Sequence, residues 1–492
     1  MQKIIITIFI LGQSISVAAK GYFDYSPDAT AAYHKIIDLR FTEAQQLIQK
    51  IRKDHPDNLI VHHLENYIDF LKVYIDENEA FFSEAEARKN HRLKLVEAGD
   101  KDSPYYLYLQ ANMRMQWAVA RIKFEQWYGA FRDINQAFKL LERNVEKYPN
   151  FMPNQKDLGF LHAIVSSLPS SIEWVSSLEG DYKKGKRELR AVLRYAEQNN
   201  FLFERETHIL YAYILLQFGK DEQGAWRAIQ ASGLNPKTSP TAAFILSNVA
   251  MKSGHNDQAI EYLKARPKST IFHPFPYLDY LLGQAKLHRL DRDADQCLQR
   301  YLNHFKGRNY IKQSYRLLAW HELVQGRKAG YRSYMKLLKK AGNTYIGADE
   351  SAQEEAEEGI VPNATILKAR LLFDGAYYQR AYDLLRPLSE QTFEHPKTSL
   401  EYHYFLGRTT HQLKRYEEAL QYYQIVIREG RTQVWYYACR AALESGHIYK
   451  AKKDYTKARA AYELCLDIQP KEHAYSLHQQ AKIGLRACLE RN

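Results

Sequence analysis

The stretch Ser445–Pro470 constrains the fold more than any other part of the chain. In SGHIYKAKKDYTKARAAYELCLDIQP, small and aromatic residues recur at helical spacing: Gly446, Tyr449, Tyr455, Ala458, Tyr462 and Pro470. A small residue in each of two helices allows a close approach, aromatic rings fill the space beside them, and proline ends the second helix. The stretch therefore predicts a helix hairpin that stacks on further hairpins.

The same pattern recurs along the chain at defined positions. The structural repeat positions are Ala44, Ala381, Gly407, Ala419, Gly446 and Ala458. The alanines at 381, 419 and 458 are separated by 38 and 39 residues, which is longer than the common period of about 34. We predict degenerate hairpins over residues 20–341, three clear repeats over 362–472 and a capping helix over 473–492.

This pattern resembles the tetratricopeptide repeat family. The resemblance implies an all-α superhelical solenoid of antiparallel helix hairpins, which holds a partner and has no catalytic activity. The run DLGFLHAIVSSLPSSIEWVSSLEGDYKKGKRELR, with Gly180-Asp181, Gly185 and Leu189, resembles a more particular eukaryotic family of this type that includes a mitochondrial outer-membrane protein. That similarity covers residues 105–215 and implies a shared architecture rather than a known activity.

The resemblance also implies where a ligand binds, because the first helix of each pair lines the concave face. Positions facing a ligand in the last two repeats are Glu401, Tyr404, Arg408 and His411, then Arg440, Leu443, His447 and Lys450. Tyr404, Arg408, His411, Arg440, His447 and Lys450 are our candidate ligand-binding residues. Arginine grips carboxylates with paired hydrogen bonds, so this surface suits an acidic or carboxylate-bearing peptide. The alternative is an ordinary charged helix face.

One specialised activity of the family is disfavoured. Members that bind chaperones grip a carboxylate with lysine and asparagine side chains. This chain has Tyr404, Arg408 and Glu444 at those positions, and Glu444 is expected to repel a carboxylate.

The first residues are typical of a signal peptide. Lys3 precedes the apolar run 4–11, and Val17-Ala18-Ala19 supplies small residues for cleavage near Ala19. We therefore expect an exported protein of the bacterial periplasm or envelope. The alternative is an uncleaved anchor, although the run is short for a membrane span.

Two other segments allow more than one interpretation. Residues 342–361 contain an acidic block without an apolar face, which predicts a solvated linker or loop, or else a short acidic docking segment. Residues 158–180 are apolar but are interrupted by His162, Pro169 and Glu173. They favour two buried helices joined by a turn, and membrane association through them is disfavoured.

No catalytic, cofactor or metal motif has the required spacing, so we expect no enzyme activity, no cofactor and no metal site. Asp291, Asp293 and Asp295 begin like a calcium loop, but Gln296 replaces its glycine and Leu302 its glutamate. The eighteen histidines are too scattered to indicate a site.

Charge and cysteine content narrow the partner class. The 69 Lys and Arg residues are interspersed with 57 Asp and Glu, which disfavours nucleic acid and favours a protein or peptide partner. A glycan-binding or membrane-associated envelope subunit remains the alternative. The four cysteines form no metal spacing. They are expected to be buried thiols, or a disulfide among Cys439, Cys465 and Cys488 after export.

Overall fold

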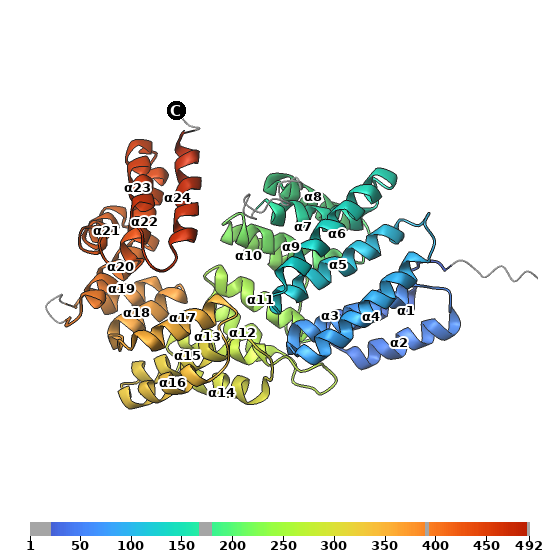
Figure 1. Ribbon diagram of the computed structural model, residues 1–492, viewed down its shortest axis with the longest axis horizontal. Coiled ribbons are helices and arrows are strands. Elements are labelled where there is room, and N and C mark those ends of the chain that lie inside the picture. Colours follow the sequence, from blue (N-terminus) through green and yellow to red (C-terminus); the bar gives the residue numbers. More distant parts are fainter. Residues whose placement is uncertain (1–20, 167–179, 389–392, 490–492) are drawn as a thin grey trace, which may run out of the picture. The chain divides into compact units, whose positions relative to one another are not determined.

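A computed structural model describes residues 21–166, 180–388 and 393–489 of the chain (Figure 1). Within these residues the fold contains 24 helices and no strand, apart from an isolated bridge between Tyr22 and Asn58. Most consecutive helices pack against each other as hairpins. The prediction of an all-α fold built from antiparallel helix hairpins is confirmed. The expected signal peptide lies outside the described residues.

The chain divides into two compact units. The first unit takes in most of the chain up to Phe203, together with Ile271–His273. Its helices are α1 (Pro27–Ile37), α2 (Phe41–Asp54), α3 (Ile60–Asp76), α4 (Glu79–Glu97), α5 (Tyr105–Lys123), α6 (Trp127–Lys147), α7 (Met152–Val165) and α8 (Tyr182–Ala196). The end of α3, from Ile75, is assigned to the second unit.

The second unit contains the remaining helices. They are α9 (Glu204–Gln217), α10 (Glu222–Gln230), α11 (Pro240–Lys252), α12 (Asn256–Ala265), α13 (Tyr277–Arg289), α14 (Ala294–His304), α15 (Ile311–Val324), α16 (Lys328–Lys340), α17 (Gly347–Glu358), α18 (Ala364–Asp374), α19 (Tyr378–Leu385), α20 (Pro396–Gln412), α21 (Tyr416–Gly430), α22 (Tyr437–Ala451), α23 (Tyr455–Asp467) and α24 (Ala474–Leu489). The hairpin pattern thus continues through the part of the sequence that we expected to be degenerate.

A common turn joins the two helices of many pairs. The residue two positions before the second helix has a positive φ at Leu39, Glu125, Lys220, Gly254, Gly326, Ala376, Lys414 and Lys453. This left-handed conformation reverses the chain within a few residues. The shared turn explains why hairpins persist where the side-chain pattern is weak.

The last repeats pack as their sequence suggests. A Cβ atom on Gly446 would lie 2.5 Å from the Tyr462 ring, and one on Gly407 would lie 2.6 Å from the Tyr423 ring. Because each tyrosine occupies the space left by the missing side chain, the two helices of the pair approach closely. Ala44, Ala381, Ala419 and Ala458 are also fully buried.

All four cysteines are buried free thiols. Cys439 on α22 and Cys465 on α23 lie closest, with 3.5 Å between their sulfur atoms.

Helices α7 and α8 of the first unit approach closely through two glycines. A Cβ atom on Gly185 would lie only 2.2 Å from the Gly159 carbonyl oxygen. The segment 167–179 between these helices lies outside the described residues, and so does much of the run for which we weighed membrane association. No helix among the described residues is long and apolar enough to cross a membrane.

The acidic segment 342–361, expected to be a linker or loop, contains helix α17. Ala352 and Ala356 are buried on one side of it, and Asp349 is fully buried near its start. The Asp349 carboxylate accepts backbone N–H groups of Tyr310 (2.6 Å) and Gln313 (2.8 Å). The small size of the buried alanines explains why the sequence shows no apolar face here.

Candidate functional site

Helices α18, α20 and α22 lie next to one another because each is the first helix of a hairpin. Side chains fix where they start: Asn363 accepts the backbone N–H of Thr365 (2.9 Å) before α18, and Pro396 occupies the first turn of α20. On each helix a basic residue follows the small packing residue: Ala369-Arg370, Gly407-Arg408 and Gly446-His447. We call the face that carries these basic residues the inner face.

The predicted residues Tyr404 and Arg408 pack among aromatic rings. Tyr404 is only 2% exposed, and its ring centre lies 5.2 Å from that of Tyr437 and 6.1 Å from that of Tyr436. The Arg408 guanidinium lies 4.0 Å from the centre of the Phe373 ring. Among the described residues it has no hydrogen bond or ion pair. Arg408 therefore offers unused donors on the inner face, whereas Tyr404 offers little surface.

Three of the predicted residues lie within 4 Å of the Glu444 carboxylate. Arg440 Nε donates to its carboxylate at 2.8 Å, His447 Nδ1 lies at 3.3 Å and His411 Nδ1 at 3.7 Å. Burial alone would raise the pKa of Glu444, but the His447 hydrogen bond and the charges of Arg440 and Arg408 hold it below its usual range. Glu444 therefore neutralises part of the basic surface that the sequence predicts.

Lys220 brings a further cation to this region of the second unit. It lies in the turn between α9 and α10, and its Nζ donates to Gln480 Oε1 on α24 (3.2 Å). Burial, and then the charges of Arg440 and Lys450, lower the pKa of Lys220. We call Arg408, Arg440, Lys450 and Lys220 the basic cluster.

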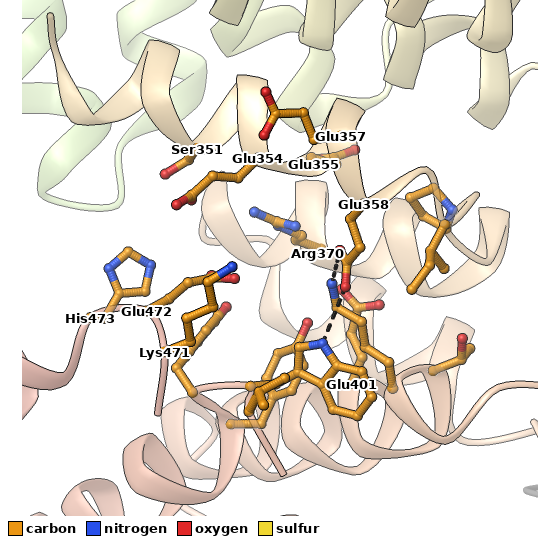
Figure 2. Close-up of a pocket in the computed structure, with 18 of the residues that line it drawn as sticks. Ser351, Glu354, Glu355, Glu357, Glu358, Arg370, Glu401, Lys471, Glu472 and His473 are labelled. Atoms are coloured by element: carbon orange, nitrogen blue, oxygen red, sulfur yellow. Dashed lines mark hydrogen bonds and ion pairs between the residues drawn. The ribbon is translucent and has the colours of Figure 1, made fainter. Parts of the chain in front are cut away.

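A pocket of about 400 Å³ opens near the N-terminal ends of α20 and α22. Its walls come from α15, α17, α18, α20, the start of α22 and the turn before α24 (Figure 2). Trp435, Tyr436 and Tyr437 form an aromatic side of it. Tyr436 and Tyr437 also contact Tyr404, so the pocket is continuous with the inner face.

The glutamates of α17 form the acidic wall of this pocket. Glu355 accepts a hydrogen bond from Trp320 Nε1 (2.8 Å) and lies 3.8 Å from Arg316. Glu358 accepts one from Trp435 Nε1 (3.2 Å) and pairs with Lys397. These contacts hold α17 in place, so the segment expected to be a linker contributes directly to the site.

Three other side chains in the pocket have unused polar groups. Figure 2 shows Arg370 between the acidic residues of α17 and Glu401. The Arg370 guanidinium lies 4.7 Å from the Trp320 ring centre. Neither Arg370, Glu401 nor the hydroxyl of Tyr437, a residue only 4% exposed, has a hydrogen bond or ion pair within the part of the chain that the structure describes. Burial raises the pKa of Glu401, and the charges of Arg370 and Lys397 oppose this rise.

Two segments of the chain match a known family. Residues 400–428 and 440–472 match the tetratricopeptide repeat, and they cover the pairs α20–α21 and α22–α23. The chain contains tetratricopeptide repeats. No curated protein sequence matches it.

Solved structures resemble the tetratricopeptide-repeat chain only loosely. The apo form of the quorum sensor NprR from B. thuringiensis is 12% identical with a TM-score of 0.35, covering 82% of this chain and 97% of its own. The human IFIT1 dimer with m7Gppp-AAAA is 11% identical with a TM-score of 0.31, covering 95% and 90%. Yeast Tom70 is 13% identical with a TM-score of 0.25, covering 93% and 95%. These values are too low to transfer a binding mode.

The tetratricopeptide phase accounts for some of the site and misses the rest. It places Arg408, His411, Arg440 and His447 together and puts Glu401 at a ligand-facing position, although Glu401 was not among our candidate residues. It misses Arg370 and Tyr437. Arg370 follows Ala369 as Arg408 follows Gly407, so the phase applied one repeat earlier would have found it. The acidic wall has no such signal, because α17 lies outside the clear repeats. Among the described residues, no group of three or more His, Cys, Asp or Glu side chains is arranged to hold a metal ion.

Proposed function

We propose that this protein is an exported, non-enzymatic scaffold that binds a peptide segment of a protein partner along the inner face of α18, α20 and α22. The helices are fixed by packing before a ligand arrives, so binding orders few side chains. The predicted binding residues Arg408, His411, Arg440, His447 and Lys450 take part in this surface, with Tyr404 as packing support.

The observation that carries the proposal is a pair of arginines without partners. Arg370 and Arg408 occupy equivalent places in consecutive repeats. Each guanidinium stacks on an aromatic ring, Trp320 or Phe373, and makes no hydrogen bond to the described residues. A guanidinium has five N–H donors, and both arginines are only partly buried, so their donors are accessible to a ligand. Peptide carbonyl and carboxylate oxygens are the acceptors that such donors fit.

The basic cluster supports an acidic residue in the partner beside Arg408 on α20 and Lys450 on α22. Glu444 offsets Arg440 and the histidines, but Arg408, Lys220 and Lys450 have no carboxylate partner among the described residues. A carboxylate of the ligand would gain charge-assisted hydrogen bonds here. The preference for an acidic residue is a separate claim from peptide binding. It can be wrong even if the inner face does bind a peptide.

An array of immobilised 12-residue peptides of varied sequence tests peptide binding by residues 20–492. We expect a set of bound peptides enriched in Asp or Glu, and at least tenfold weaker binding by R370Q and R408Q, because each loses charge-assisted hydrogen bonds. R428Q on α21 is the control, since Arg428 is exposed and, among the described residues, pairs with Glu429 alone. Equal binding by all three variants would remove the inner face from the proposal.

Export rests on the first nineteen residues alone. If they are a signal peptide, the protein recovered from the cell envelope begins near Lys20 when its N-terminus is sequenced. A protein that retains Met1 in the cytoplasmic fraction would contradict export and leave the proposed peptide binding unaffected.

A further inference from the structure

The pocket beside α17 has an excess of acidic groups in a chain whose formal charge is +12. Its lining contains six glutamates (354, 355, 357, 358, 401 and 472) against two arginines and two lysines (316, 370, 397 and 471). With His473 neutral, the lining therefore has a formal charge of −2. The net charge of the pocket lining is therefore opposite to that of the basic cluster.

Internal pairing does not remove this excess. Arg316 lies near Glu355, and Lys397 pairs with Glu358, so these two cations are already matched. Glu401 has no partner among the described residues, although it lies in the same pocket as Arg370. Burial raises the pKa of Glu354, and the carboxylates of Glu472 and Glu350 raise it further. Beyond those two ion pairs, four glutamates share the lining with Arg370 and Lys471, so the excess of two carboxylates remains.

The aromatic side of the pocket also favours a cation. Trp435, Tyr436 and Tyr437 present rings to it, and a cation is attracted to the face of such rings. The pocket already shows this arrangement, because Lys397 Nζ lies 5.9 Å from the centre of the Trp435 ring. Tyr437 is only 4% exposed. Its hydroxyl has no hydrogen bond to the described residues and can accept one from a bound cation.

We infer that this pocket receives a lysine or arginine side chain of the bound peptide, with Glu401 as its principal carboxylate partner and Tyr436 and Tyr437 beside its charge. The inference rests on the proposed peptide binding and names the residue that this part of the site selects. Arg370, the one unpartnered arginine of the pocket, donates to a carbonyl oxygen of the same peptide segment.

The size and spacing of the polar groups fit this occupant. A volume of about 400 Å³ exceeds that of one side chain and lies in the range of pockets that enclose small ligands, so flanking peptide groups fit as well. The carboxylates do not converge as metal ligands do within the described chain. They are spread along one wall, which suits a cation that makes several hydrogen bonds.

The pocket and the basic cluster together predict a ligand with both charges. Glu401 and Arg408, the member of the basic cluster on α20, are seven residues apart, which corresponds to about 10 Å along a helix. An extended peptide covers that distance in about three residues. The preferred sequence therefore has a basic residue at the pocket and an acidic residue about three positions away.

Two small probes test the pocket without the rest of the peptide. Saturation-transfer NMR would compare Nα-acetyl-lysine methylamide with Nα-acetyl-glutamine methylamide on residues 20–492. We expect transfer to the lysine probe only, and at least a tenfold loss of its affinity in E401Q. E463Q on α23 is the matched control, because Glu463 is exposed and lies outside the pocket. Thermal unfolding followed by circular dichroism establishes that E401Q is folded.

The peptide array separates this inference from the proposed function. Bound peptides enriched in Lys or Arg at one position, with enrichment lost in E401Q and kept in E463Q, support the inference. Bound peptides without basic enrichment, or equal transfer to both probes, overturn it and leave peptide binding intact. If no peptide binds but the lysine probe does, the proposed function fails and the pocket's preference for a cation stands.

Discussion

The first helices of both units carry polar residues inside the repeat stack, but they differ in how those residues are paired. In the first unit, α3, α5 and α7 are joined by buried hydrogen bonds. In the second unit, α18 and α20 carry Arg370, Glu401 and Arg408, none of which has a hydrogen bond or ion pair within the described residues. This difference fits the proposed function, in which Arg370, Glu401 and Arg408 contact the ligand.

The network of the first unit is continuous across three helices. Asn66 Nδ2 donates to Gln116 Oε1 (2.7 Å), and Gln116 Nε2 donates to Asn112 Oδ1 (2.9 Å). Asn112 Nδ2 then donates to Asp157 Oδ2 (2.7 Å), and Asp157 pairs with Lys156 at 2.5 Å. All five side chains are at least nine-tenths buried. Buried networks of this kind stabilise only when every member is satisfied.

Breaking this network should give the largest effect. Asp157→Ala leaves the Lys156 ammonium, whose side chain is fully buried, without its carboxylate. We expect the unfolding free energy of the first unit to fall by about 3–5 kcal/mol. Hydrogen–deuterium exchange followed by mass spectrometry would report it as faster exchange in α5 and α7, with α20–α23 unchanged.

The double variant K156M/D157L is the control for this prediction. It removes both charges and supplies apolar side chains, so it should recover part of the lost stability. If D157A alone leaves exchange in α5 and α7 unchanged, the buried network does not stabilise the first unit.

The second unit should instead be sensitive to the small residues between its helices. Gly446→Ala places a methyl group 2.5 Å from the Tyr462 ring, so the ring has to move. We expect a loss of about 1–3 kcal/mol from overpacking, in spite of the higher helix propensity of alanine. Gly347→Ala is the control, because no atom lies within 4 Å of its added Cβ. Urea unfolding measures both, and equal midpoints would contradict the close packing.

The sequence predicts the last three hairpins of the second unit better than it predicts the first unit, for a physical reason. Where a glycine faces a tyrosine, as Gly446 faces Tyr462, both residues are conspicuous at helical spacing. The sequence alone is therefore enough to predict the hairpin. Buried polar residues such as Asn112 and Asp157 interrupt the apolar period, so the sequence of the first unit looks degenerate although its hairpins are regular.

The candidate site shows the same limit. Arg408 could be placed on the inner face because the repeat phase is clear around Gly407. The acidic wall could not be placed, because Ala352 and Ala356 bury too little apolar surface to distinguish α17 from a solvated linker. The pocket itself depends on α15, α17 and the turn before α24, and their proximity has no local signal in the sequence.

The two units should also differ in how their stability depends on pH, although this difference is smaller than the effects above. The pKa of Glu444 in the folded protein lies below its usual value of about 4.3, so at acidic pH the unfolded chain binds more protons than the folded one. The stability that Glu444 contributes is present above about pH 4.3 and is lost as the pH falls further.

We therefore expect Glu444→Gln to lower the stability of α22 by about 1–2 kcal/mol at pH 7, and by progressively less in acid. Exchange rates of α22 peptides between pH 7 and pH 3, corrected for intrinsic exchange, measure the difference. A constant difference across this range would show that Glu444 acts through packing rather than charge. Exchange in α5 should not respond to the substitution at any pH.

The smallest effects should be equal in the two units, because they arise in the turn that both share. Glu125 in the first unit (φ 58°) and Lys453 in the second (φ 62°) adopt the left-handed conformation two residues before a helix. Glycine removes the strain of about 1–2 kcal/mol at such a residue but increases the entropy of the unfolded chain by a similar amount. We therefore expect Glu125→Gly and Lys453→Gly each to shift the unfolding free energy by less than about 1 kcal/mol. In contrast, Gly326→Ala places a side chain on a residue with φ 82° and should destabilise its hairpin by about 1 kcal/mol. Unlike responses of the two glycine variants in urea unfolding would mean that the turn, like the inner polar residues, serves different purposes in the two units.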